Sequence, residues 1–275
     1  MKIDAHQHFW KYNPVRDAWI DESMQCIRRD FLPADLESLL KENGMDGCVS
    51  VQADQSEEET EFLLELARTS AFIKAVIGWV NLRADDAKDR LSHFARNEKF
   101  KGVRHILQAE PSEFMSNSEF RYGISCLEPL GLTYDILVYP EQLPSAIQLV
   151  RRFPNQAFVI DHLAKPNIKK QEIKTWEGDI RLLAEMPNVH CKISGMVTEA
   201  DWLGWKPEDF KPYLDVVFDA FGTGRLMFGS DWPVCLLAAQ YEEVLGNTNE
   251  YLEALTSQEK NKVMGGNALT FYNLK

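Results

Sequence analysis

The chain has 275 residues, of which 45% are apolar and 26% charged, as is ordinary for a soluble globular protein with one large core. Its 42 acidic residues outnumber 30 Lys and Arg residues, which gives a formal net charge of −12. Because the basic residues are scattered, the sequence disfavours nucleic acid and anionic membranes as partners. A small anionic ligand is not excluded, since one local arginine can override the overall field.

The cysteines indicate a reducing compartment. They are odd in number and form no Cys-X-X-Cys pair: Cys26, Cys48, Cys126, Cys191 and Cys235. We therefore expect buried free thiols rather than a disulfide framework or a structural zinc site. The sequence shows no apolar signal-peptide segment and no run of transmembrane length, so the prediction is a cytoplasmic protein.

The chain opens with a short extended run that contains His6 and His8, followed by Phe9 and Trp10. Because side chains alternate along a strand, the two imidazoles are expected to point the same way. They could then share one metal ion or bind two substrate oxygens. Surface histidines on an edge strand would show the same pattern, so His-X-His alone is a weak signal.

Beyond a long loop at 9–30, apolar strands alternate with amphipathic helices. The first helix carries Leu36, Leu39 and Leu40 on one face and is closed by Gly44. The later strands are predicted at 47–53, 74–81, 102–107, 133–138, 156–162, 189–194 and 226–231. The later helices are predicted at 56–70, 84–97, 116–130, 143–150, 170–185 and 207–221, with a mostly helical remainder.

Eight strands, each followed by a helix, indicate a parallel sheet covered on both faces. The count fits an α/β fold of the (β/α)₈ TIM-barrel type. An open doubly wound sheet is the alternative, but no Gly-X-Gly-X-X-Gly motif or P-loop opens the first helix. No linker or shift in composition divides the chain, so we expect a single domain over residues 1–275.

In such a barrel the reacting groups lie at the carboxyl ends of the strands. His6, His8, His162 and Asp231 all fall at predicted strand ends and could together hold one divalent metal with open positions. A metal would polarise a carbonyl or activate a water, and Asp231 would accept the proton of that water. Taken singly, Asp231 could cap a helix and His162 could be a core histidine. Chance rarely brings all four to one end of a barrel.

Other strand ends supply weaker candidates for a substrate pocket, namely Gln52, Trp79, Arg104, His105, Lys192 and Trp10. Five tryptophans also follow strands: Trp10, Trp79, Trp202, Trp205 and Trp232. Apolar sugar faces pack well on such rings, which favours a carbohydrate-like ligand. Tryptophans also pack loops onto a barrel mouth, and that alternative stays open.

Three motifs stand at or beside the predicted strand ends: His-Gln-His-Phe-Trp at 6–10, Asp-His-Leu-Ala-Lys-Pro at 161–166 and Phe-Gly-Ser-Asp-Trp-Pro at 228–233. Together they resemble the amidohydrolase superfamily, and more narrowly its amidohydrolase 2 branch of sugar-lactone hydrolases, the L-fuconolactonase and L-rhamnonolactonase-like enzymes. The segments 101–108 and 194–202 belong to the same pattern, and the similarity spans essentially the whole chain. The resemblance implies a TIM-like barrel of the metal-dependent-hydrolase type.

The resemblance also implies hydrolysis of a sugar lactone, an aldonolactone such as L-fuconolactone, without a covalent intermediate. Asp231 would take a proton from the attacking water and later help to protonate the departing alkoxide. His6, His8 and His162 would stabilise the carbonyl oxygen as it gains charge, directly or through a metal.

By the same resemblance, Arg104 and His105 would hold the lactone carbonyl or ring hydroxyls, with a rim salt bridge as the alternative for Arg104. Binuclear members use a bridging lysine near the end of strand four and a second histidine on strand five or six. Strand four here ends in Arg104-His105 and strand five has no histidine, so at most one ion is expected. Zinc is the first choice and manganese the second. Some relatives need no metal, which leaves its requirement open.

Two other functions remain open. A metal-dependent decarboxylase of the same superfamily also uses His-X-His and a strand-eight aspartate, and it would lose activity on chelation. A barrel that binds a sugar acid without turnover is the third reading, although binding alone needs no general base. The loop at 9–30 would suit either a lid or a contact in a homo-oligomer.

Overall fold

The computed structural model describes residues 1–275 and contains one sheet of eight parallel strands in chain order. The strands are β1 (Ile3–Gln7), β2 (Gly47–Val51), β3 (Ile73–Gly78), β4 (Phe100–His105), β5 (Thr133–Ile136), β6 (Phe158–Ile160), β7 (Val189–Ile193) and β8 (Leu226–Phe228). The ends of β8 and β1 meet through a parallel bridge between Gln7 and Trp232. The sheet is therefore a nearly closed barrel, and the predicted (β/α)₈ architecture is confirmed.

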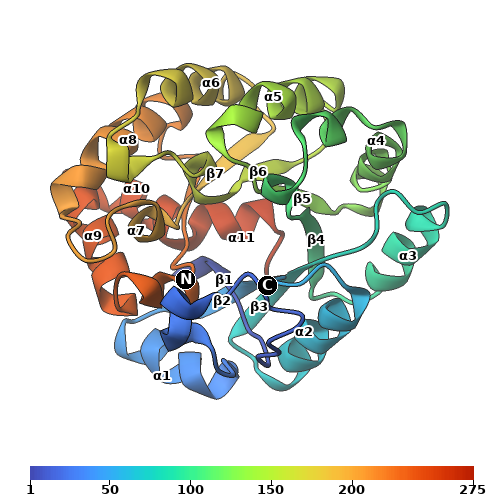
Figure 1. The fold of residues 1–275 in the computed structure, drawn as a ribbon, viewed down its shortest axis with the longest axis horizontal. Coiled ribbons are helices and arrows are strands. Elements are labelled where there is room, and N and C mark those ends of the chain that lie inside the picture. Colours follow the sequence, from blue (N-terminus) through green and yellow to red (C-terminus); the bar gives the residue numbers. More distant parts are fainter.

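Helices surround the strands, as the view down the barrel shows (Figure 1). They are α1 (Pro33–Glu42), α2 (Glu57–Thr69), α3 (Ala87–Phe94), α4 (Ser118–Ser125), α5 (Leu143–Arg152), α6 (Lys174–Ala184), α7 (Met196–Glu199), α8 (Pro207–Phe221), α9 (Tyr241–Leu252), α10 (Ser257–Asn261) and α11 (Asn267–Phe271). None of them is long and apolar enough to span a bilayer.

The single helix predicted over 116–130 was wrong. The segment consists of a 3₁₀ turn at Ser112–Ser116, then α4, then a second 3₁₀ turn at Glu128–Leu130. The side chain of Asn117 accepts hydrogen bonds from the amides of Glu119 and Phe120 and so starts a new helix there. Pro129 has no amide hydrogen and cannot continue the helix that precedes it.

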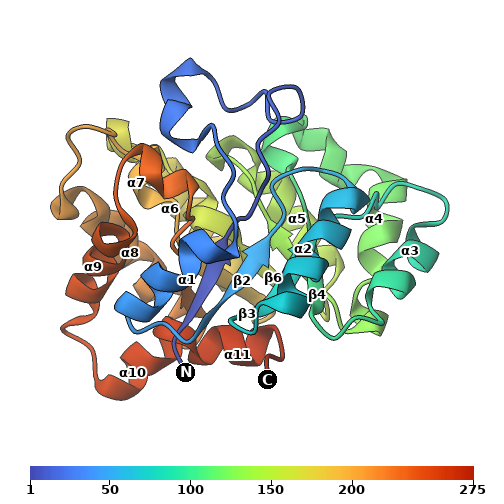
Figure 2. The same ribbon diagram turned by 90° about the horizontal axis from the view of Figure 1, so that it is seen from below.

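The apolar core has two parts. The larger cluster lies between the strands and the helices, and the smaller one joins alternate residues of the strands, such as Ile3 and Ala5 of β1, to Ala268 and Tyr272 at the C-terminus. Helix α11 thus closes the amino-terminal end of the barrel, where both chain termini lie (Figure 2). The opposite end remains available for a functional site.

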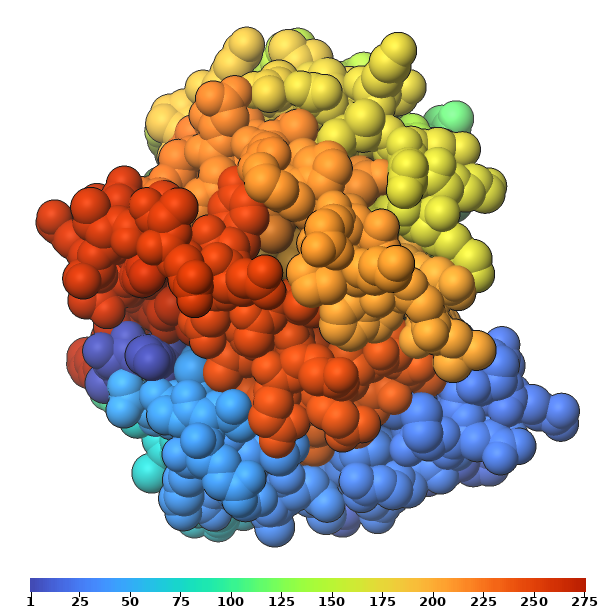
Figure 3. All heavy atoms as spheres, turned by 90° about the vertical axis from the view of Figure 1, so that its left-hand side faces the viewer, coloured from blue at the N-terminus to red at the C-terminus, as the bar shows by residue number.

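The loop after β1 rises above that opposite end of the barrel (Figure 2). It is anchored where the amide of Trp10 donates to the carbonyl of Phe31, at 3.0 Å, and the amide of Phe31 donates back, at 2.9 Å. Its 3₁₀ helix, Glu22–Ile27, packs beside the segment after β8, where Cys26 Sγ lies 3.6 Å from the carbonyl oxygen of Leu236. Figure 3 shows these N-terminal parts of the chain lying against its C-terminal third.

Candidate active site

Strand β1 delivers His6 and His8 to the open end of the barrel. Their Nε2 atoms are 3.2 Å apart, as the alternation of strand side chains predicts. Gly229 follows strand β8 directly, and a Cβ atom there would lie 2.6 Å from the Cβ of His6. Only glycine lets the two strand ends approach so closely.

Asp231 lies at the centre of the histidines. Its Oδ1 is 3.4 Å from His8 Nε2 and 3.9 Å from the Nε2 atoms of both His6 and His162. Burial by itself would raise the pKa of this carboxyl group, but the neighbouring His162 and His8 outweigh burial and hold the pKa below its ordinary value. The structure thus brings together all four residues that the sequence placed at strand ends.

His162 comes from a turn of unusual backbone geometry. The residues from His162 to Lys165 all have positive φ, at 54°, 55°, 57° and 50°, although none is a glycine. The predicted strand over 156–162 therefore ends early, at Ile160. The His162 ring is fixed by a 2.9 Å contact from Nδ1 to Ser194 Oγ, and a Cβ at Gly195 would lie 2.6 Å from the same nitrogen.

A network of buried charges lies beneath His6. Asp161 receives two cations, with Arg104 Nη1 at 3.1 Å from Oδ2 and Lys192 Nζ at 3.0 Å from Oδ1. Lys192 also pairs with Asp135 at 2.5 Å. Burial would raise the pKa of Asp161, but the charge of Lys192, the adjacent His6 and the charge of Arg104 hold it well below its ordinary value. Asp161 is therefore ionised at neutral pH.

This network also sets the state of His6. Its Nδ1 lies 3.3 Å from Asp161 Oδ1, and burial lowers the pKa of the imidazole well below its ordinary value. Two charged groups thus lie against Nδ1, because Lys192 Nζ is also 3.1 Å from it. On the other side of the ring, Nε2 lies 3.3 Å from Arg104 Nη1.

The remaining predicted residues divide into two groups. Gln52 belongs to the network, because its Oε1 accepts a 2.9 Å hydrogen bond from Arg104 Nε and its carbonyl oxygen accepts another from Nη2. Trp79 and His105 form a separate cluster, in which Trp79 Nε1 donates to His105 Nδ1 at 3.3 Å and His105 Nε2 lies 3.1 Å from Glu110. Neither that cluster nor the enclosed Lys192 lines the cavity described next.

A cavity of about 570 Å³ opens above the histidines. Pockets for small molecules usually occupy roughly 300–1,000 Å³. Four of the groups described above form its floor, namely His8, Arg104, His162 and Asp231. Its walls include four aromatic residues, Trp10, Trp19, Tyr139 and Trp202. Trp19 belongs to the loop after β1, so this loop contributes a wall to the cavity.

Only part of the predicted tryptophan set faces this cavity. Trp10 and Trp202 line it. Trp205 instead donates from Nε1 to the carbonyl of Ala238 at 2.8 Å, and the buried Trp232 packs edge-on against Phe31. Those two tryptophans therefore hold loops onto the barrel.

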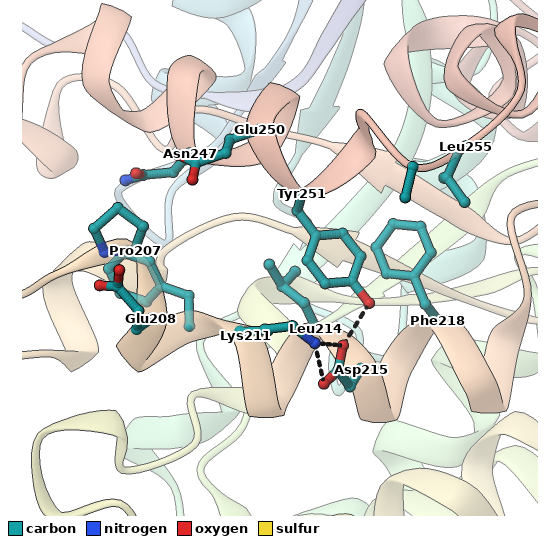
Figure 4. Close-up of a pocket in the computed structure, with 12 residues that line it drawn as sticks. Pro207, Glu208, Lys211, Leu214, Asp215, Phe218, Asn247, Glu250, Tyr251 and Leu255 are labelled. Atoms are coloured by element: carbon teal, nitrogen blue, oxygen red, sulfur yellow. Dashed lines mark hydrogen bonds and ion pairs between the residues drawn. The ribbon is translucent and has the colours of Figure 1, made fainter.

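A second cavity, of about 440 Å³, lies on the outside of the helix layer between α8 and α9 (Figure 4). There Lys211 and the hydroxyl of Tyr251 both contact the carboxylate of Asp215, the latter at 2.9 Å. No histidine or cysteine lines this cavity. The cavity at the barrel mouth is therefore the candidate active site.

The family model described as amidohydrolase matches residues 3–274. The chain belongs to the amidohydrolase family. This amidohydrolase is 40% identical to L-fucono-1,5-lactonase of Burkholderia multivorans, across 100% of this chain and 96% of the relative. It is also similar to a solved amidohydrolase from Burkholderia multivorans with bound zinc, with a TM-score of 0.97, 40% identity and full coverage of both chains. The resemblance read from the motifs is confirmed.

A solved 5-carboxyvanillate decarboxylase from Sphingomonas paucimobilis is more distant from this amidohydrolase. The TM-score is 0.69 at 14% identity, with coverage of 100% of this chain and 99% of the other. Likeness at that level shows a shared barrel fold and nothing about the reaction.

The donor atoms of the amidohydrolase fit one divalent ion. His6, His8 and Asp231 each offer a ligand atom within 4.8 Å of the others. Tetrahedral zinc with bonds of about 2.0–2.2 Å separates its ligand atoms by roughly 3.3 Å. His8 is well prepared, because its Nδ1 donates to the carbonyl of Val51 at 2.8 Å and leaves the lone pair of Nε2 free. His6 is less well prepared, because the Arg104 guanidinium approaches the His6 Nε2 atom that would bind the ion.

Sequence reasoning assigned no role to three groups of this amidohydrolase. Asp161 holds the buried cations, and Lys165 pairs with Glu199 on the cavity wall at 3.0 Å. A signal for each was present, since Asp161 and Lys165 share the 161–166 motif with His162 and Glu199 lies in the 194–202 motif.

Proposed function

We propose that this amidohydrolase opens the ring of a sugar lactone, an aldonolactone such as L-fucono-1,5-lactone, by addition of water to the carbonyl carbon. The observation that carries the proposal is the position of Asp231, 3.4 Å from His8 on the floor of a 570 Å³ cavity. The 40% identity to L-fucono-1,5-lactonase across the full chain supports the substrate class.

In this proposal Asp231 is the general base. Its lowered pKa keeps the carboxylate ionised at neutral pH, so it can accept a proton from a water on the cavity floor. The water oxygen bonds to the carbonyl carbon, and the bond from that carbon to the ring oxygen then breaks. Asp231 returns the proton to the departing ring oxygen. The product is a hydroxy acid, which releases one proton to solution at neutral pH.

The carbonyl oxygen gains negative charge during the attack, and the floor offers groups that stabilise it. Arg104 is permanently charged and is held in place by Gln52 and Asp161. His162 is a neutral imidazole, because burial lowers its pKa well below the ordinary value. We propose that a divalent ion, zinc first or manganese, is held by His6, His8 and Asp231 beside His162, and that it supplies Lewis-acid polarisation when bound.

The other predicted residues take different places in the proposal. Arg104 and Trp10 contact the substrate, because both line the cavity. Gln52 and Lys192 act through Arg104 and His6, which they contact directly. Trp79 and His105 support the cavity wall. We further propose a cytoplasmic location, which the five free cysteines support. Four of the thiols are buried as predicted, whereas Cys26, on the loop after β1, is exposed.

The test is a pH-indicator assay of proton release on a panel of γ- and δ-lactones of sugars. The enzyme is assayed as purified and after chelation, with bound zinc and manganese quantified. We expect acid release from aldonolactones and a fall in activity on chelation that added zinc restores. Full activity after chelation would refute the role of the ion, and no acid release across the panel would refute the lactonase. A decarboxylase would instead release carbon dioxide from aromatic acids and consume a proton.

A further inference from the structure

Two charged residues on the cavity wall have no part in the proposed attack of water. Lys165 follows β6 and Glu199 ends α7, and Lys165 Nζ lies 3.0 Å from Glu199 Oε1. The side chains are 18% and 19% exposed, and both line the cavity that contains Asp231. The two residues are therefore an ion pair that a ligand in the cavity would meet.

The backbone fixes this pair relative to the reacting groups. His162 and Lys165 are the first and last residues of the left-handed turn described above. Each non-glycine residue in that conformation is strained, and such strain persists where the surrounding structure determines it. Glu199 lies on the short helix that follows Gly195, against which the His162 ring packs. The left-handed turn and the helix after Gly195 thus hold His162, on the cavity floor, and the Lys165–Glu199 pair, on its wall, in fixed positions relative to each other.

The pair has unused hydrogen-bonding capacity. An ammonium group has three donors and a carboxylate has about four acceptor sites. Besides Glu199, the Lys165 ammonium faces the Tyr139 ring, whose centroid lies 5.3 Å from Nζ. No side chain or amide donates to Glu199 apart from Lys165. Burial raises the pKa of Glu199, while the charge of Glu199 outweighs burial and raises the pKa of Lys165, so an ionised Lys165 is favoured.

We propose that the Lys165–Glu199 pair is the subsite that binds hydroxyl groups of the sugar lactone and selects polyhydroxylated over plain lactones. The inference rests on the proposed function and names its specificity-determining residues. A hydroxyl group both donates and accepts, so two neighbouring hydroxyls match the ammonium and the carboxylate. A ligand without hydroxyls would displace water from both charges and replace none of its hydrogen bonds, which disfavours that ligand strongly.

The experiment compares an aldono-1,5-lactone with δ-valerolactone, which has the same ring without hydroxyls. The enzymes are wild type, Glu199→Gln and Lys165→Met. The matched controls are Lys169→Met and Asp201→Asn, from an exposed ion pair at 3.3 Å on the same two loops. Circular dichroism and the melting temperature verify folding.

We expect Glu199→Gln and Lys165→Met to lower kcat/KM on the aldonolactone by roughly tenfold or more, mainly through KM. Their kcat/KM on δ-valerolactone should not fall, since that ligand makes none of the lost hydrogen bonds. The control variants should change neither value. An equal loss on both lactones, or no loss on the aldonolactone, would overturn the subsite.

A separate measurement distinguishes failure of the subsite from failure of the lactonase. Calorimetry with a 1,5-anhydroalditol, a neutral polyhydroxylated ring that cannot hydrolyse, reports binding without turnover. We expect binding to wild type and a roughly tenfold weaker affinity in Glu199→Gln. If wild type opens no lactone, the proposed function is wrong, and the subsite is then judged by this affinity alone. Equal affinity in both proteins would refute it.

Discussion

Lysine–carboxylate pairs occur both in the network beneath the floor of the cavity and on its wall, under different conditions. Beneath the floor, Lys192 is fully buried and contacts two carboxylates, Asp135 and Asp161, in addition to His6. On the wall, Lys165 forms one ion pair, with Glu199, and both residues line the cavity. The Lys192 ammonium has no donor left for a ligand and can only fix its neighbours. The wall pair retains that capacity, so the same residue types serve orientation in one place and recognition in the other.

The largest expected effect concerns Asp231, the carboxylate on the cavity floor. Asp231→Asn keeps the shape of the side chain and removes the carboxylate that accepts the proton. We expect kcat to fall roughly 10³-fold, the range of an effective general base. The melting temperature should stay close to that of wild type, and steady-state assays with the pH indicator measure the loss. Asp219→Asn, at an exposed carboxylate on α8, is the control. An active Asp231→Asn enzyme would exclude Asp231 as the base.

Removing each lysine in turn tests whether the buried pair and the wall pair differ in their contribution to stability. Lys192→Met leaves Asp135 and Asp161 buried without their shared cation, and we expect the free energy of unfolding to fall by about 3–5 kcal/mol. Lys165→Met leaves Glu199 beside the cavity, where water can solvate it, and should cost about 1 kcal/mol. Urea unfolding followed by circular dichroism measures both. Similar losses would show that the two pairs do not differ as described.

A milder variant covers the case in which Lys192→Met does not fold. Tyr272→Phe removes a hydroxyl that lies 3.2 Å from Asp135 Oδ2 but leaves every charge in place. We expect a loss of about 2 kcal/mol, the usual contribution of one hydrogen bond to a charged group. A loss as large as that expected for Lys192→Met would mean that hydrogen bonds, and not charge, determine how much the network beneath the floor contributes to stability.

Glu59 shows what burial does to a carboxylate without a cation in contact. Its Oε2 accepts from the amides of Ala53 and Asp54, at 3.0 and 2.6 Å, and burial raises its pKa to about 8. Asp161, which is fully buried but touches two cations, has a lowered pKa. Asp135, which touches a single cation, has a pKa that burial raises to about 6. Contact with two cations therefore outweighs burial here, and contact with one does not.

This contrast predicts a pH dependence of stability. The folded pKa of Glu59 lies above the ordinary value of 4.5, so the folded state binds more protons between pH 4.5 and about 8. The contribution of Glu59 is fully present below pH 4.5 and is lost as the pH rises toward 8. Relative to Glu59→Gln, the wild type should lose a few kcal/mol over this range, at about 1.4 kcal/mol per pKa unit. Parallel stability curves for the two proteins would contradict the raised pKa.

The sequence predicted the barrel and its reacting centre because both depend on simple rules. Eight apolar strands separated by amphipathic helices leave few folds, and parallel strands bring their carboxyl ends to one mouth. His6, His8 and Asp231 meet because β1 and β8 are neighbours in a closed barrel. The same rule could not separate residues on the cavity from residues behind it. Trp79 and Lys192 are at strand ends, yet neither lines the cavity.

The parts that sequence could not predict depend on backbone geometry and on long-range pairing. No local rule places four successive non-glycine residues in the left-handed region, so the sequence predicts a strand up to His162 where the structure has the start of this turn. The partner of Lys165 is Glu199, which comes from the next strand–helix unit. The position of Glu199 relative to Lys165 depends both on that turn and on Gly195, against which the His162 ring packs.

The smallest expected effect concerns the aromatic part of the wall. Trp202 and Trp205 each donate an indole N–H to a backbone carbonyl, of Thr198 and Ala238, but only Trp202 lines the cavity. Trp202→Phe removes part of an apolar surface that a sugar ring would cover, so KM for the aldonolactone should rise roughly threefold with kcat unchanged. Trp205→Phe loses a comparable hydrogen bond outside the cavity and should lower the melting temperature without affecting KM. Equal KM values for the two variants would mean that recognition depends on the polar wall alone, and the charged pair would then carry the whole selectivity of the cavity.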